Sequence, residues 1–129
     1  ISELEGIAKT NTDVGKLAKF ALAQTRFDDG KYDEAATLYQ ELIALPDAVV
    51  AKETINFQLA KTYEKQSKTK EAADLYFTIA KTAAEAKDSD GKPVPMGETA
   101  NEAKEKLTAL DAERAKEIVV PTPESPFGN

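Results

Sequence analysis

The stretch Gly30-Lys-Tyr-Asp-Glu-Ala-Ala-Thr-Leu-Tyr-Gln-Glu-Leu-Ile-Ala-Leu-Pro46 predicts a single helix that is entered by a glycine turn and stopped by a proline. Its apolar residues recur at steps of three and four and therefore share one helical face: Tyr32, Ala35, Leu38, Tyr39, Leu42 and Leu45. Asp33 and Glu34 lie in the first turn, where negative charge complements the helix dipole. Pro46 lacks an N–H and restricts the residue before it, so we expect the helix to end there.

The same pattern returns 37 residues later in the chain. The matched residues are Phe20 with Phe57, Leu22-Ala23 with Leu59-Ala60, Ala35 with Ala72, and Tyr39 with Tyr76. In the first unit Ala23 and Ala35 fall on the two helices of one predicted hairpin, and Ala60 and Ala72 repeat this arrangement. Small side chains at these positions let the helix axes approach closely. A fixed period with two helices per unit predicts an α-solenoid.

Helical periodicity and end signals predict the remaining elements. The expected helical segments are residues 1–9, about 14–27, 30–46, about 48–65, about 69–86 and about 97–110, with a short last turn through Lys116. Candidate N-terminal caps are the cluster Thr10-Asn11-Thr12-Asp13, then Asp47 and Asp111, because short polar side chains accept from free backbone N–H groups. The inward candidates of the helix at 14–27 include Leu17, Phe20, Ala21, Ala23, Gln24 and Phe27. The tyrosines at 32, 39, 63 and 76 are interpreted as core or seam residues.

This organisation predicts one helical domain over residues 1–118 with repeats at about 14–47 and 48–86. The helix at about 97–110 keeps only the first half of a third unit and is expected to cap the core. Its apolar stripe is Met96, Ala100, Ala103, Leu107 and Leu110. The tail at 119–129 contains three prolines and is expected to be extended.

Composition narrows the class of function. The chain has 129 residues, a net charge of −6, and neither cysteine nor histidine. A net negative charge with interspersed lysines argues against nucleic-acid binding. No apolar run reaches the roughly 18 residues of a membrane span. The chain begins at Ile1 rather than Met, which indicates a processed or excised piece with any targeting or anchoring segment upstream.

The two units resemble the tetratricopeptide repeat (TPR) family. The residues that carry the resemblance are Leu22-Ala23, Gly30, Tyr32, Ala35, Tyr39 and Pro46, then Leu59-Ala60, Tyr63, Ala72 and Tyr76. The usual unit has 34 residues, and the three additional ones here lie either in the connection at 46–51 or in a longer helix. Arg26 stands where an aromatic residue is common, and Ser67 replaces the turn glycine. The resemblance implies a right-handed all-α solenoid of about two and a half repeats.

Within this family, the long connection and the incomplete third unit are similar to those of bacterial envelope proteins, namely YfgM-like domains and outer-membrane-assembly lipoproteins. That similarity implies a periplasmic or membrane-anchored location, with the anchor upstream of Ile1. The function that follows is non-catalytic binding of a peptide or protein on the concave face. An oligomerisation module of an envelope complex is the alternative, because exposed ends of a short solenoid invite self-association.

The candidate partner-binding residues are Phe20, Gln24, Phe57 and Lys61. Phe20 and Phe57 occupy equivalent places in the two units, and the resemblance puts that place near the concave face, with Gln24 and Lys61 one turn further on. The rings either grip a partner or fill the seam between neighbouring helices, and the sequence leaves both interpretations open.

No catalytic, cofactor-binding or metal-binding residue is assigned. Without histidine and cysteine the usual bases, nucleophiles and soft metal ligands are missing, so an enzyme is disfavoured. The segment Asp88-Ser-Asp90-Gly91 faintly suggests a calcium loop. Its glycine comes at the fourth position rather than the sixth, and position twelve is Thr99 rather than glutamate, so a solvated turn is the preferred interpretation.

Overall fold

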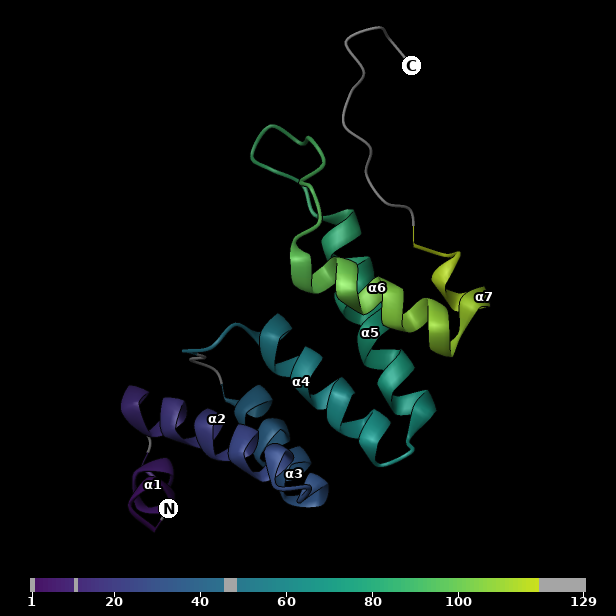
Figure 1. Ribbon diagram of the computed structural model, residues 1–129. Helices are drawn as coiled ribbons and strands as arrows, with labels where there is room; N and C mark the ends of the chain where they lie inside the picture. The colour runs from purple at the N-terminus through teal and green to yellow at the C-terminus, as the bar shows by residue number, and fades with distance from the viewer. Residues whose placement is uncertain (1, 11, 46–48, 119–129) are drawn as a thin grey trace, which may run out of the picture. The chain divides into compact units, whose positions relative to one another are not determined.

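The computed structural model describes residues 2–10, 12–45 and 49–118, and this part of the chain is all-helical (Figure 1). The helices are α1 Ser2–Ala8, α2 Asp13–Asp28, α3 Tyr32–Ala44, α4 Lys52–Lys65, α5 Thr69–Glu85, α6 Glu98–Leu110 and α7 Ala112–Ala115. The all-α prediction is confirmed. The chain forms two compact units, the first ending at Ala72 and the second beginning at Ala73, so that the boundary falls within α5.

The helix ends follow the predicted signals, with one correction. Leu45, the residue before the proline, is extended, with φ −75° and ψ 135°, and α3 stops at Ala44. The helix expected from residue 48 begins at Lys52 instead. Helix α3 therefore ends earlier, and α4 begins later, than the sequence predicts. The predicted cap at Asp47 falls outside the described residues.

Two of the predicted caps form in the structure. The Thr12 side chain accepts a hydrogen bond from the Gly15 backbone N–H at 2.9 Å, which satisfies a free donor at the start of α2. Asp111 does the same for Arg114 at the start of α7, at 3.2 Å. Gly15 is also a point of close approach, because an added Cβ would collide with Thr10 and with the Ile7 carbonyl.

The turns after α2 and α4 share one backbone geometry. In the first, Lys31 N–H donates to the Arg26 carbonyl at 2.8 Å and Gly30 has φ 78°. In the second, Lys68 N–H donates to the Tyr63 carbonyl at 2.8 Å, and Ser67 has φ 63°. Both are Schellman turns with a left-handed residue at the centre. The serine that replaces the turn glycine keeps the glycine conformation.

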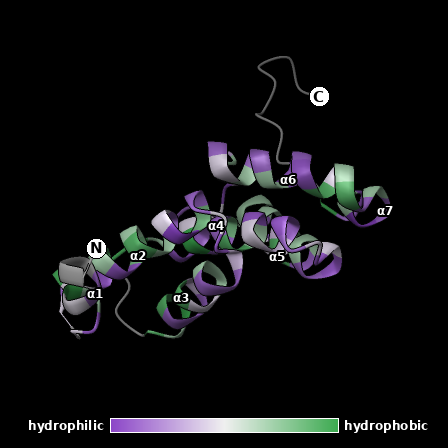
Figure 2. Ribbon diagram, turned by 60° about the horizontal axis from the view of Figure 1, so that its bottom comes forward, coloured by the Kyte–Doolittle hydropathy of each residue, from purple (hydrophilic) through white to green (hydrophobic). Residues whose placement is uncertain are grey.

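The alanines predicted at the helix crossings are completely buried. Ala23, Ala35, Ala60 and Ala72 each have 0% exposure. Ala23 and Ala35 lie on α2 and α3, which pack against each other. Figure 2 shows hydrophobic and hydrophilic residues on different sides of the helices, as expected for helices that bury one face.

Two residues expected to point inward on α2 are exposed. Leu17 keeps 51% of its surface exposed, and Gln24 is exposed as well. Val14, one turn before Leu17, is exposed at 64%. Of the predicted inward residues, Ala23 is fully buried, and Phe20, Ala21 and Phe27 are half-buried. Helix α2 also buries Ala18 and Leu22.

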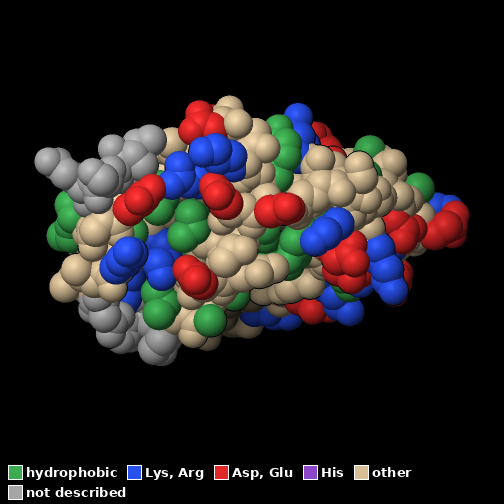
Figure 3. Space-filling view, turned by 90° about the horizontal axis from the view of Figure 1, so that it is seen from below, with side chains coloured by type: hydrophobic (Ala, Val, Ile, Leu, Met, Phe, Trp, Pro, Cys, Tyr) green, Lys and Arg blue, Asp and Glu red, His purple; other side chains and the backbone are tan. Residues whose placement is uncertain are grey.

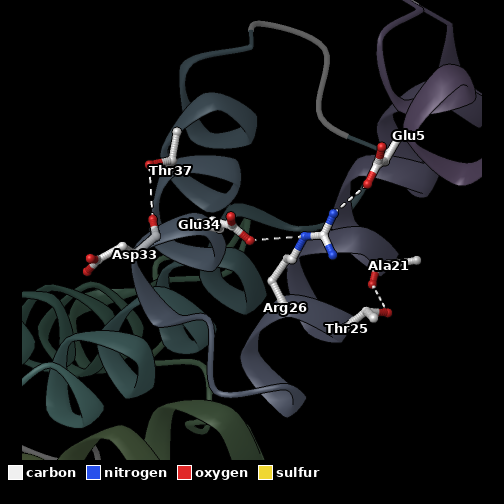
Figure 4. Close-up of polar contacts among 7 residues, drawn as sticks. All are labelled: Glu5, Ala21, Thr25, Arg26, Asp33, Glu34 and Thr37. Carbon is white, nitrogen blue, oxygen red and sulfur yellow. Dashed lines mark hydrogen bonds and ion pairs between the residues drawn. The ribbon is translucent and has the colours of Figure 1, made fainter. Parts of the chain in front are cut away.

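Arg26 joins three helices of the first unit (Figure 4). Its Nη2 lies 2.5 Å from Glu5 Oε1 on α1, and its Nε lies 3.3 Å from Glu34 Oε2 on α3. The Arg26 side chain is only 16% exposed, so these ion pairs are partly desolvated. Arg26 on α2 thus links α1 and α3.

The second unit contains most of α5, then α6 and α7. The α6 stripe is buried at Ala100, Ala103 and Leu107, each with 0% exposure, whereas Leu110 is half-buried. Arg114 attaches α7 to α5 through an ion pair with Asp74 and through the Phe77 ring, whose centroid lies 4.5 Å from the guanidinium carbon.

We expect Ala35→Leu and Ala72→Leu to reduce the free energy of unfolding by about 1–3 kcal/mol, because each site is completely buried and a larger side chain overpacks it. Urea denaturation of the two variants measures the effect. Ala44→Leu at the exposed end of α3 is the control and should leave stability nearly unchanged. Wild-type stability in both crossing variants would contradict the close packing.

Exchanging the residue types at the centres of the two turns, Gly30 and Ser67, tests whether positive φ destabilises a residue other than glycine. Gly30→Ser should destabilise the protein by about 1 kcal/mol, because a residue with a Cβ resists positive φ. Ser67→Gly should stabilise it, by less than about 1 kcal/mol, since glycine also loses more backbone entropy on folding. Thermal melting of both variants gives the signs. A Ser67→Gly variant that melts well below the wild type would argue against a strained serine.

Candidate functional site

A small depression lies on the surface shared by α2, α3 and α4 of the first unit. We call it the polar hollow. Its volume is ≈ 340 Å³, and its lining residues are Gln24, Phe27, Asp28, Tyr39, Gln58 and Lys61. Small-molecule sites usually measure about 300–1,000 Å³, so the polar hollow is at the small end of that range and has room for a side chain or a short piece of backbone.

Lys61 lies over two aromatic rings at the edge of the polar hollow. Its Nζ is 5.7 Å from the centroid of Phe27 and 5.9 Å from that of Phe57. A cation over the face of an aromatic ring is attracted by the electron density of the ring. The two rings therefore position the Lys61 ammonium group, which forms no ion pair with a carboxylate among the described residues.

The Tyr39 hydroxyl is the unusual group of the polar hollow. The Tyr39 side chain has 0% exposure, and among the described residues its hydroxyl has no hydrogen-bond partner. The edge of the ring packs against Phe20, with centroids 5.9 Å apart. Burial, and next the negative charge of Asp28, raise the pKa of the Tyr39 hydroxyl above its ordinary value of 10.0. The hydroxyl is protonated at neutral pH, as every tyrosine hydroxyl is, and leaving such a buried donor unpaired typically costs about 1–3 kcal/mol.

The charges of the polar hollow are balanced but not paired. Asp28 supplies one negative charge and Lys61 one positive charge. Within the described ranges neither forms an ion pair. Both charges are therefore available to a ligand. Gln24 and Gln58 add amides, each of which both donates and accepts hydrogen bonds.

An apolar stripe leads along α2 to the polar hollow. It consists of Val14 and Leu17, the two exposed apolar residues of this helix. Residues spaced by three, four and seven positions share a helical face, so Leu17 lies on the same face as Gln24 and Asp28. The exposed apolar residues and the polar lining residues of α2 thus lie on one face of the helix.

The structure brings together part of the predicted site. Gln24 and Lys61 both line the polar hollow, and Phe57 lies beneath Lys61. Phe57 is only 7% exposed, whereas Phe20 is half-buried against Tyr39. The two phenylalanines are therefore not equivalent, although the repeat matches them.

Four further lining residues were not predicted as site residues from the sequence. Phe27 was predicted to point inward, and Tyr39 was assigned to the core, which is correct for its ring; nothing in the pattern indicates an unpaired hydroxyl. Asp28 is the last residue of α2, and no sequence motif marks it as a site residue. Gln58 follows Phe57 directly. Its position three residues before Lys61, on the same face of the helix, was the one sequence feature that could have indicated it as a site residue.

A second and larger depression, of ≈ 690 Å³, lies between α1, α2 and α3. Ala8, Leu22 and Leu38 form its apolar floor, and charged residues surround it. Those charges are largely paired with each other, as Lys19 is with Glu41 at 3.3 Å and Arg26 with Glu5 and Glu34. Figure 3 shows acidic and basic side chains interspersed around small hydrophobic patches on one face of the molecule.

The segment compared with a calcium loop is a self-contained turn. Asp88 Oδ1 accepts from the backbone N–H groups of Asp90 and Lys92, at 2.8 and 3.0 Å. The Asp88 carboxylate thus accepts hydrogen bonds from the backbone of its own loop. Among the described residues, no group of three or more acidic side chains is arranged to hold a metal ion.

In the described part of the chain, every helix is too short or too polar to cross a bilayer. Comparisons of the chain with protein-family models, with curated proteins and with solved structures find no match. The geometry of the first unit is therefore the basis for assigning a function.

Replacing Tyr39 by Phe tests the unpaired hydroxyl. We expect the free energy of unfolding to stay the same or rise by up to about 1 kcal/mol, because the change removes a buried polar group that has no partner. Tyr63→Phe is the matched control. The Tyr63 hydroxyl accepts from Gln40 Nε2 at 2.6 Å, and its loss should cost about 0.5–1.5 kcal/mol. A larger loss in Tyr39→Phe than in Tyr63→Phe would show that the Tyr39 hydroxyl has a partner in solution.

Proposed function

We propose that this chain is a non-catalytic protein-interaction module of the TPR-like solenoid type. It binds an extended segment of another protein on the surface formed by the apolar stripe and the polar hollow. The matched spacing of the two units and the equivalent turns at Gly30 and Ser67 support the repeat interpretation.

The observation that carries the proposal is the combination of exposed apolar side chains with an unpaired polar cluster on one face. Leu17 and Val14 expose apolar surface that folding leaves unburied. Further along the same face, Asp28 and Lys61 form no ion pair within the described residues, and the buried Tyr39 hydroxyl has no hydrogen-bond partner there. A partner segment would bury the apolar side chains and supply the missing polar contacts, and both effects favour association.

An oligomerisation module is the alternative function, and the same stripe favours it. Val14 and Leu17 of two copies would bury each other, as in a symmetric dimer. The polar hollow argues for a different partner, because its unpaired groups would gain nothing from an apolar contact between two stripes.

The burial of the two phenylalanines decides which residues test the proposal. Phe57 is nearly buried, so Phe57→Ala would cost about 3–5 kcal/mol of stability and obscure any effect on binding. Leu17 is half exposed, and its replacement by Ser removes an anchor with little effect on the fold. Val94→Ser is the matched control, because Val94 is an exposed apolar residue of the second unit, at 37%.

The experiment selects peptides from a random displayed library on the immobilised wild-type protein and measures their dissociation constants for each variant. We expect Leu17→Ser to weaken the selected peptides at least about tenfold, since apolar anchors dominate such interfaces. Val94→Ser should bind as the wild type does, and both variants should keep the wild-type melting temperature.

Each other outcome has a definite meaning. Equal binding by Leu17→Ser and the wild type would refute the proposed surface. A wild-type dimer in light scattering that Leu17→Ser converts to a monomer would favour the oligomerisation module instead.

A further inference from the structure

We propose that the polar hollow recognises an uncharged amide, the side chain of an asparagine or glutamine in the bound segment. This inference rests on the proposed function and goes further, because it assigns the chemistry of the residue that enters the polar hollow. It also places that residue at a defined distance from an apolar anchor.

The charge pattern selects a neutral group. A carboxylate would gain from Lys61 but would face the Asp28 carboxylate, and an ammonium or guanidinium group would gain from Asp28 but would face Lys61. Like charges brought together in an interface disfavour association. A primary amide meets neither penalty, since its NH₂ donates to Asp28 while its carbonyl accepts from Lys61.

The neutral polar groups of the polar hollow fit the same ligand. Gln24 and Gln58 each offer a donor and an acceptor, which is the pattern that pairs with another amide. The Tyr39 hydroxyl is protonated at neutral pH, as every tyrosine hydroxyl is. It is buried beneath the polar hollow, with no hydrogen-bond partner among the described residues. An apolar side chain would leave all of these groups unpaired and is disfavoured for that reason.

The apolar stripe sets the spacing between anchor and amide. Along an α-helix each residue advances 1.5 Å, so Gln24 and Asp28 lie about 10 and about 16 Å beyond Leu17. An extended chain covers about 3.3 Å per residue. A segment that packs an apolar side chain on Leu17 therefore brings a residue about three to five positions away to the polar hollow.

The test uses synthetic peptides of glycine and serine that contain one leucine and one variable residue. The variable residue is glutamine, glutamate, lysine or leucine, placed two to six positions from the fixed leucine in both orders. Binding to the full chain is measured by fluorescence anisotropy. We expect the glutamine peptides to bind best, with an optimum at three to five positions and about tenfold weaker binding when the residue carries a charge.

Variants that remove one charge of the polar hollow should change the preferred residue in opposite directions. Asp28→Asn leaves Lys61 as the only charge of the polar hollow and should shift the preference from glutamine to glutamate. Lys61→Met keeps an apolar contact with the rings but removes the cation, and should shift the preference to lysine. Asp29→Asn and Lys65→Met are the matched controls, because both residues are exposed neighbours that do not line the polar hollow. Both controls should keep the wild-type preference.

The outcomes separate this inference from the function on which it rests. A wild-type preference for glutamate, lysine or leucine, or no preference at all, would overturn amide recognition. If the fixed leucine still anchors the peptides through Leu17 in that case, the binding function stands without it. If no peptide of the set binds and library selection also yields none that depend on Leu17, both proposals fail.

Discussion

The close crossing of α2 and α3 is the constraint on which the first unit depends. Ala23 and Ala35 are completely buried on these two helices, which pack against each other. Short side chains at the crossing bring the helix axes near each other and leave space on either side for larger residues. Leu42 and the ring of Tyr39 on α3 are buried in that space. The Tyr39 hydroxyl is thereby buried near the charge of Asp28, and no hydrogen-bond partner for it lies within the described residues.

The turns and the polar contacts between helices position each helix of the first unit against its neighbours. The Schellman turn at Gly30 reverses the chain within a few residues, so that α3 packs against α2. Hydrogen bonds between elements then align the neighbours, as when Gln40 donates to Tyr63 between α3 and α4, or when Gln66 donates to Asp33. Arg26 holds α1 against α2 and α3 by pairing with Glu5 and Glu34. Apolar side chains thus form the buried core, and polar contacts between the helices fix their positions.

The polar hollow and the depression between α1, α2 and α3 differ in how their charged groups are paired. Around the larger one, the charged groups largely satisfy one another, so a ligand there would have to break existing pairs. In the polar hollow, Asp28 and Lys61 stay apart and Lys61 rests on aromatic rings, an interaction worth about 0.5–1 kcal/mol at exposed sites. Such a contact is weak enough for a ligand to compete with it. The smaller depression is for this reason the better candidate for specific recognition.

The sequence alone determined the helical class, most helix ends and the buried alanines. These features depend on local chemistry and on residue spacing: proline stops a helix, short polar side chains cap one, and residues three or four apart share a face. Only the tertiary structure decided which of the apolar faces are covered. Leu17 and Leu22 look alike in the α2 pattern, yet Leu17 is exposed and Leu22 is buried under the packing of α1 and α3. Phe20 and Phe57 are equivalent in the repeat but differ in burial, and the unpaired Tyr39 hydroxyl has no sequence signature at all. The physical reason is that periodicity sets the direction of a side chain on its own helix, whereas the neighbouring helices determine what that side chain meets.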